Sequence, residues 1–183
     1  ARSILGDPRS DKMQKNLNLK VKFRESFRPF APSVLKEDSS NWFDINVDSP
    51  YMLLVANINS DKKIEMTDKQ KNLFGIEKLN IKRSEIPAVT HVDYSARIQT
   101  VTKTNNGRYY DLISKFKEKT GCPVLVNTSF NVRGEPIVNS PTDAFNCFMG
   151  TELDYLVIGD CILDKSRQNP DLKKDYTKEF ELD

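Results

Sequence analysis

The chain has 183 residues and a mass of 21.0 kDa, which is the size of one domain with one substantial hydrophobic core. Its hydrophobic content of 38% and charged content of 30% are typical of a soluble globular protein, whereas its formal net charge of +2 is too small for general nucleic-acid binding. No apolar run approaches the roughly 20 residues that cross a bilayer, and no signal peptide is visible.

The cysteines indicate the compartment. Cys122, Cys147 and Cys161 are odd in number and lack Cys-x-x-Cys spacing, which argues against a disulfide scaffold and a zinc site. We therefore predict a cytoplasmic protein without a metal site, in which all three cysteines pack as small buried apolar residues.

The N-terminal part contains one predicted helix and one aromatic, cationic segment. The chain starts at Ala1 without an initiator Met, which indicates a cut inside a larger protein. Apolar residues at helical spacing predict a short polar helix over residues 11–22. Residues 22–34 interleave phenylalanines with cations and contain two prolines, so we expect an extended, partly buried segment there.

The middle of the chain is predicted to contain strands and one long excursion. Residues 51–58 are predicted to form a buried strand, and the Lys- and Asn-rich residues 59–84 a surface excursion or lid. Two further strands, 86–91 and 96–102, are expected to be joined by a hairpin turn.

The second half alternates helices with strands. Apolar residues at i, i+3, i+4 and i+7 predict an amphipathic helix from Tyr109 to about Gly121, and residues 123–126 are predicted to be a short strand. Ser140 followed by Pro141 predicts a helix start, and one or two strands are expected within residues 153–163. This alternation indicates an α/β domain.

The polar segment 127–138 directly follows a predicted core strand, the usual place of ligand groups in open α/β sheets. Its Asn, Thr and Ser side chains offer donors and acceptors, and Arg133 offers a planar fork suited to phosphate or carboxylate. Gly134 would let the backbone approach a ligand closely. The alternative is a polar turn held by side-chain to backbone hydrogen bonds.

Two further segments place polar residues among apolar ones. If residues 22–33 are extended, Lys22, Arg24 and Arg28 project to one face and form a positive patch, although the phenylalanines can equally be core with solvated cations. His91 is the only histidine, and a lone histidine is more often structural than catalytic. Arg97 and Gln99 share one face of the following strand.

The common phosphate-binding and nucleophile motifs are absent from the sequence. Neither a P-loop, nor a Gly-x-Gly-x-x-Gly fingerprint, nor a Gly-x-Ser-x-Gly elbow occurs. Phosphate binding would therefore depend on Lys and Arg side chains and on backbone N–H groups.

From Arg2 to about Leu163 the chain resembles the C-terminal domain of the NodU/TobZ-type O-carbamoyltransferase family. The resemblance rests on the three polar segments, 22–33, 90–100 and 127–138, which occur in the same order in that family. The resemblance implies a single α/β domain over residues 1–164, with a YrdC/Sua5-like twisted mixed β-sheet and flanking helices, and a polar tail over 165–183. Because residues 2–5 resemble the end of the motif joining the family's two domains, the N-terminal Kae1-like domain, with its metal and acceptor site, is expected outside this chain.

The resemblance also implies a function. The domain would bind carbamoyl phosphate and ATP, with Mg²⁺ accompanying the nucleotide, and form carbamoyl-adenylate for transfer to a hydroxyl of a small-molecule acceptor. By resemblance, Lys22 and Arg28 match the phosphate-binding pair, Arg97 and Arg133 the other anion-binding arginines, and Ser129 and Asn131 the nucleotide site. The remaining substrate-binding candidates are Arg24, His91, Gln99, Asn127 and Thr128. Tyr94-Ser95 departs from the small Gly-Thr turn expected beside Arg97.

Alternative functions remain at this stage. The cations of residues 22–28 could contact an RNA backbone, which would make this a YrdC-like RNA- or nucleotide-binding module without transferase activity of its own. A threonylcarbamoyl-adenylate synthase and a structural domain with a decayed site are further alternatives. A homodimer is left open, and no membrane partner is expected.

Overall fold

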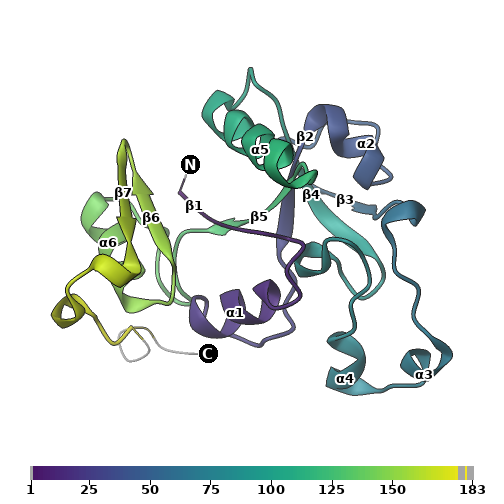
Figure 1. Cartoon of the computed structure of the whole chain (residues 1–183), viewed down its shortest axis with the longest axis horizontal. Coiled ribbons are helices and arrows are strands. Elements are labelled where there is room, and N and C mark those ends of the chain that lie inside the picture. The colour runs from purple at the N-terminus through teal and green to yellow at the C-terminus, as the bar shows by residue number, and fades with distance from the viewer. Residues whose placement is uncertain (1, 177–179, 181–183) are drawn as a thin grey trace. The chain divides into compact units, whose positions relative to one another are not determined.

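The computed structural model describes residues 2–176 and 180 (Figure 1). The chain forms two compact units: the first unit comprises Ala1–Ile4, Lys15–Arg28 and Ser129–Asp183, and the second unit comprises Leu5–Gln14 and Pro29–Thr128. In chain order the α-helices and strands are β1 (Ser3–Gly6), α1 (Met13–Lys20), β2 (Ala31–Leu35), α2 (Ser39–Trp42), β3 (Leu54–Asn57), α3 (Asp68–Lys71), α4 (Gly75–Leu79), β4 (Ser95–Val101), α5 (Gly107–Thr120), β5 (Val124–Ser129), α6 (Pro141–Gly150), β6 (Tyr155–Ile158) and β7 (Cys161–Asp164). Short 3-10 helices occur at η1 (Lys36–Asp38), η2 (Ser60–Lys62), η3 (Pro87–Val89), η4 (Lys165–Arg167) and η5 (Pro170–Leu172).

A five-stranded mixed sheet has the strand order β1-β5-β2-β4-β3. Strand β2 runs parallel to β4 and antiparallel to β5, and β3 runs antiparallel to β4. The predicted α/β class, with a mixed sheet and flanking helices, is confirmed.

One face of this sheet is apolar at one end and polar at the other. Leu35, Val101 and Leu125 form a buried cluster with Tyr109 and Ile113 of α5, the helix that lies along the sheet in Figure 1. Since strand side chains alternate between faces, positions two residues away along the strands lie on this same face. There the polar side chains Ser33, Gln99 and Asn127 replace the apolar ones. The opposite face is apolar, with Val34, Ile98, Val124 and Val126 all at 0% exposure.

Helix α5 confirms the predicted amphipathic helix. It ends because Gly121 adopts a left-handed conformation with φ of 75° and donates its N–H to the Lys117 carbonyl at 2.8 Å. This is the residue type that tolerates such a helix end without strain.

In the first unit, α6 packs against the hairpin of β6 and β7. The helix begins as predicted, with the Ser140 hydroxyl accepting the Asp143 N–H at 3.1 Å and the Asp143 carboxylate accepting the Ser140 N–H at 2.9 Å. Both bonds satisfy N–H groups that otherwise lack an intrahelical partner.

We expect Ser140→Ala to lower the free energy of unfolding by about 1 kcal/mol, because it removes this N-cap hydroxyl. Urea denaturation followed by circular dichroism measures the change. Ser40→Ala is the control, since Ser40 is exposed and its hydroxyl makes no hydrogen bond among the described residues. Equal stability of the two variants would contradict a stabilising cap.

The predicted extended segment after α1 is instead a series of turns. The buried Asn18 causes this, because its Nδ2 donates to the Ser26 carbonyl at 3.1 Å and to the Arg28 carbonyl at 2.8 Å. Phe23 has a positive φ of 48°, and only residues 31–35 form a strand. The prediction that residues 22–28 present their cations as an extended strand was therefore wrong.

Two strand predictions also need correction. Residues 51–58 contain only the short strand β3, which is largely exposed because it is the last strand at one edge of the sheet. Residues 86–91 form the 3-10 turn η3 rather than a strand, since Pro87 lacks the N–H of a ladder and favours the first position of a helical turn.

Two further predictions concern the excursion after β3 and the burial of the cysteines. Residues 59–84 form a largely exposed excursion that ends at the buried Arg83 and Ser84. It contains the short helices α3 and α4, which Figure 1 shows standing away from the sheet. Cys122 and Cys147 are buried as expected, but Cys161 is exposed on β7, so the prediction of burial was wrong there. Among the described residues, no helix is long and apolar enough to span a membrane.

Candidate anion-binding site

The loop that follows β5 is fixed by the buried Lys22. Its Nζ lies 2.5 Å from the Ser129 carbonyl, 2.8 Å from the Asn131 carbonyl and 2.9 Å from the Asn131 Oδ1. These contacts use the three N–H donors of an ammonium group, and the side chain is only 4% exposed. Burial, together with the charge of Arg24, lowers the pKa of Lys22 to about 8.

The same loop is closed at its other end by Glu135. The Asn131 Nδ2 donates to the Glu135 carbonyl at 2.7 Å, and the Val132 N–H donates to the Glu135 Oε2 at 2.8 Å. The Ser129 hydroxyl donates to the Asn131 Oδ1 at 2.6 Å, and Gly134 has a φ of 78°. We call residues 129–135 the anion loop. Its Ser and Asn side chains support the loop itself, and Arg133 is its positively charged residue, whose charge acts on Arg24 and Glu25.

Three arginines of the first unit act on one another electrostatically. Arg24 is half-buried; burial lowers its pKa, and the charges of Arg28 and Arg133 lower it further. The Arg24 Nε donates to the Asn18 Oδ1 at 2.6 Å, which orients its guanidinium. A backbone N–H lowers the pKa of the exposed Glu25, as do the charges of all three arginines. The charges of three arginines thus act on the single carboxylate of Glu25, so positive charge is in excess among these four side chains.

A separate polar cluster lies on the sheet of the second unit. The Asn127 Nδ2 donates to the Ser33 hydroxyl at 3.0 Å and to the Gln99 Oε1 at 2.8 Å. The Ser33 hydroxyl donates to the Gln99 Oε1 at 2.7 Å, and the Gln99 Nε2 donates to the Pro50 carbonyl at 3.1 Å. The structure therefore brings together Gln99 and Asn127, two predicted site residues, with Ser33, which was not predicted.

The remaining predicted residues of the second unit differ in surroundings. His91 Nδ1 lies 3.1 Å from the Ser95 hydroxyl, and burial lowers the pKa of its imidazole. This hydrogen bond matches the structural role that a lone histidine usually has. Arg97 is exposed on β4, on the face of Gln99, and Thr128 is half-buried on β5.

Sequence reasoning missed the residues that support the anion loop. Arg2 donates to the Val138 carbonyl at 3.1 Å, and its own carbonyl accepts the Phe130 N–H at 3.0 Å. Glu135 and Asn18 were missed because their partners are mainly backbone atoms. For Ser33, the available signal was a hydroxyl residue inside the apolar run of β2.

Metal ligands are absent from the part of the chain that the structure describes. No group of three or more His, Cys, Asp or Glu side chains is close enough there to hold a metal ion. The chemistry of the described residues is instead that of guanidinium, amide and hydroxyl groups.

The sequence of the chain shows to which protein family it belongs. The sequence profile of the family described as Carbamoyltransferase C-terminus matches residues 1–165. The chain belongs to this family. The family resemblance predicted from the three polar segments is therefore confirmed.

Three curated relatives of this Carbamoyltransferase C-terminus chain come from bacteria. It is 57% identical over 184 residues to the uncharacterized protein sll1178 of Synechocystis, covering 100% of this chain and 30% of that protein. It is 40% identical to the nodulation protein NolNO of Sinorhizobium fredii, covering 93% of this chain and 22% of that protein. It is 33% identical to the 3'-hydroxymethylcephem-O-carbamoyltransferase of Streptomyces clavuligerus, covering 87% of this chain and 26% of that protein. The chain thus spans less than a third of the length of these relatives.

Proposed function

We propose that this chain is the part of an O-carbamoyltransferase that binds carbamoyl phosphate and ATP and forms carbamoyl-adenylate. The observation that supports this most is the loop that the buried Lys22 fixes, because this loop carries Arg133, whose charge acts together with those of Arg24 and Arg28. Both substrates carry several negative charges, and guanidinium forks match phosphate oxygens in geometry as well as in charge.

In this proposal the arginines act on the charge that develops during adenylate formation. Water first cleaves carbamoyl phosphate to carbamate and inorganic phosphate. A carbamate oxygen then attacks the α-phosphorus of ATP, the bond from that phosphorus to the oxygen bridging it to the β-phosphorus breaks, and pyrophosphate departs. Negative charge grows on the leaving group, so positive groups already in place lower the barrier. Arg24, Arg28 and Arg133 bind these phosphates, Mg²⁺ arrives with the nucleotide, and Lys22 holds the anion loop.

The polar cluster of the second unit suits uncharged parts of the substrates. Asn127 and Gln99 offer amide donors and acceptors, which can bind an amide such as the carbamoyl group. Arg97, His91 and Thr128 remain substrate-binding candidates in this proposal. The carbamoyl group then passes to a hydroxyl of a small molecule, with AMP as the leaving group, on a Kae1-like domain.

Isothermal titration calorimetry tests the proposal directly. We expect the chain to bind ATP with Mg²⁺, and carbamoyl phosphate, with dissociation constants below about 1 mM, equivalent to about −4 kcal/mol. No heat from either ligand at millimolar concentration would contradict a competent site. Binding of single-stranded RNA with a steep salt dependence, but of neither small ligand, would instead favour the alternative of an RNA-binding module.

A further inference from the structure

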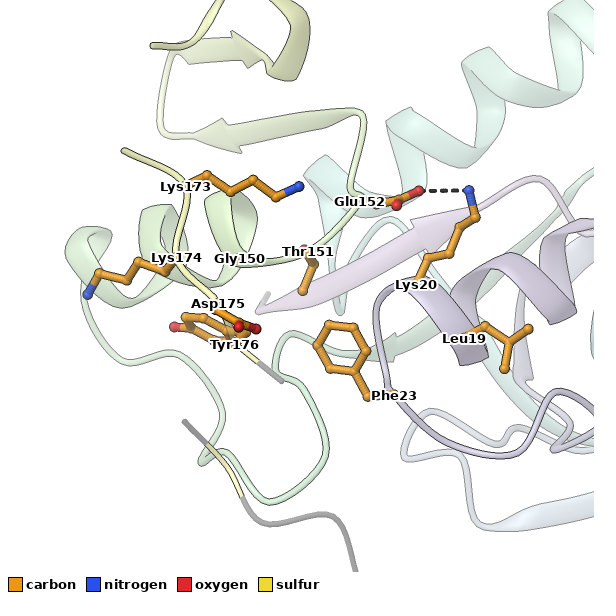
Figure 2. A pocket seen from close by; sticks show the side chains of 10 residues that line it. All are labelled: Leu19, Lys20, Phe23, Gly150, Thr151, Glu152, Lys173, Lys174, Asp175 and Tyr176. Carbon is orange, nitrogen blue, oxygen red and sulfur yellow. Dashed lines mark hydrogen bonds and ion pairs between the residues drawn. The ribbon is translucent and has the colours of Figure 1, made fainter. Parts of the chain in front are cut away.

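The segment after β7 contains a buried residue beyond the part that matches the family. The family match ends at residue 165, yet Tyr176 is only 5% exposed. Its ring lies beside Gly150 at the end of α6 (Figure 2), where a Cβ on residue 150 would lie 2.2 Å from the Tyr176 Cδ2. A glycine is therefore required opposite this ring, and the two positions fit each other closely.

Tyr176 also lines a cavity of the first unit. The cavity has a volume of about 490 Å³, and Figure 2 shows Tyr176 on its wall near Phe23 and Thr151. Lys20 and Glu152 also line the cavity and form an ion pair of 2.7 Å. The ring is thus held by packing, which leaves its hydroxyl at a defined position.

This hydroxyl contacts the anion loop. Tyr176 Oη donates to the Glu135 Oε1 at 3.1 Å, and the other oxygen of the same carboxylate accepts the Val132 N–H at 2.8 Å. Each oxygen of the Glu135 carboxylate therefore accepts one of these hydrogen bonds. The carboxylate orientation that accepts the Val132 N–H is also the one that accepts the Tyr176 hydroxyl. Val132 is 1% exposed and immediately precedes Arg133.

We propose that Tyr176 is a positioning residue for the anion loop: through Glu135 it fixes the backbone at Val132 and thereby the direction of Arg133. The effect of Tyr176 on ligand affinity rests on the function proposed above. Loss of the hydroxyl alone removes one hydrogen bond from the Glu135 carboxylate while leaving the ring packed, so the carboxylate keeps the Val132 N–H and the Cys147 side chain as hydrogen-bond partners.

Tyr176→Phe tests the inference, with Tyr110→Phe as the matched control. Tyr110 also donates its hydroxyl to a carboxylate, that of Glu37, but it belongs to α5 of the second unit. In amide hydrogen exchange without ligand, we expect the Val132 N–H to exchange at least about tenfold faster in Tyr176→Phe and unchanged in Tyr110→Phe. The dissociation constant for ATP with Mg²⁺ should rise about 3- to 10-fold only in the former.

Two readouts separate positioning from general stability. Exchange of the α6 amides should remain at wild-type rates in Tyr176→Phe, which shows that the unit stays folded. Gly150→Ala, which crowds the ring but retains the hydroxyl, should reproduce the faster exchange at Val132. Unchanged exchange at Val132 in both variants would overturn the inference even if the wild-type chain binds ATP. Absence of ATP binding by the wild type would overturn the proposed function and leave the exchange result standing.

Discussion

Arg133→Ala is expected to weaken the binding of ATP with Mg²⁺ by about 10- to 150-fold, equivalent to about 1.5–3 kcal/mol, the range for loss of hydrogen bonds to a charged group. Arg133 is the positively charged residue of the anion loop, and its charge acts on both Arg24 and Glu25. Calorimetric titration of the variant gives the dissociation constant directly.

Two companion variants sharpen this test. Arg133→Lys keeps the charge but lacks the planar fork, so we expect it to recover only part of the lost affinity. Arg108→Ala removes one exposed positive charge from α5 and should bind like the wild type. If Arg133→Ala and Arg108→Ala lose the same small amount of affinity, the arginines contribute only overall charge and the proposed site is wrong.

Lys22 is expected to give the chain an unusual dependence of stability on pH. Its pKa is about 8 in the folded state because of burial, and 10.5 is the ordinary value. Between these two pH values the unfolded chain binds more protons at Lys22 than the folded chain does. The contribution of Lys22 to the free energy of unfolding therefore increases as the pH rises from about 8 to 10.5. Below about pH 8 this contribution is constant.

Lys22→Met removes this titration, so the comparison of the two proteins isolates it. We expect the stability of the wild type relative to Lys22→Met to increase by about 2 kcal/mol between pH 7.5 and 9.5. Urea denaturation at the two pH values measures the difference, and Lys15→Met, at an exposed position of α1, is the control with no such increase. A decrease with pH, or the same change in the control, would contradict a lowered pKa at Lys22.

Local signals in the sequence predicted the parts of the fold that depend on neighbouring residues. The period of α5 and the glycine at its end, and the Ser-Pro start of α6, are visible because each is encoded within one or two helical turns. The polar block after β5 was recognisable for the same reason, since a run of hydrogen-bonding side chains directly after an apolar strand is a local pattern.

Long-range contacts account for what the sequence did not predict. The turns after α1 depend on a single buried amide, that of Asn18, and composition gives no sign that it binds carbonyls eight and ten residues later. The exposure of β3 depends on its place at the edge of the sheet, which its apolar composition conceals. Lys22 was predicted as a phosphate-binding residue, and its partners, 107 and 109 residues away, could not be identified from spacing.

The first unit draws on separate parts of the chain, and this has a consequence for biosynthesis. Lys22 binds a partner that lies 107 residues later in the chain, whereas residues 29–128 of the second unit are contiguous. Domains synthesised first generally fold first, and closing a longer loop costs more entropy. During translation the second unit can therefore fold on the ribosome while residues 15–28 remain without their partners. A nascent chain that has released β5 but not residues 130–135 from the ribosome would hold a folded sheet and no anion loop.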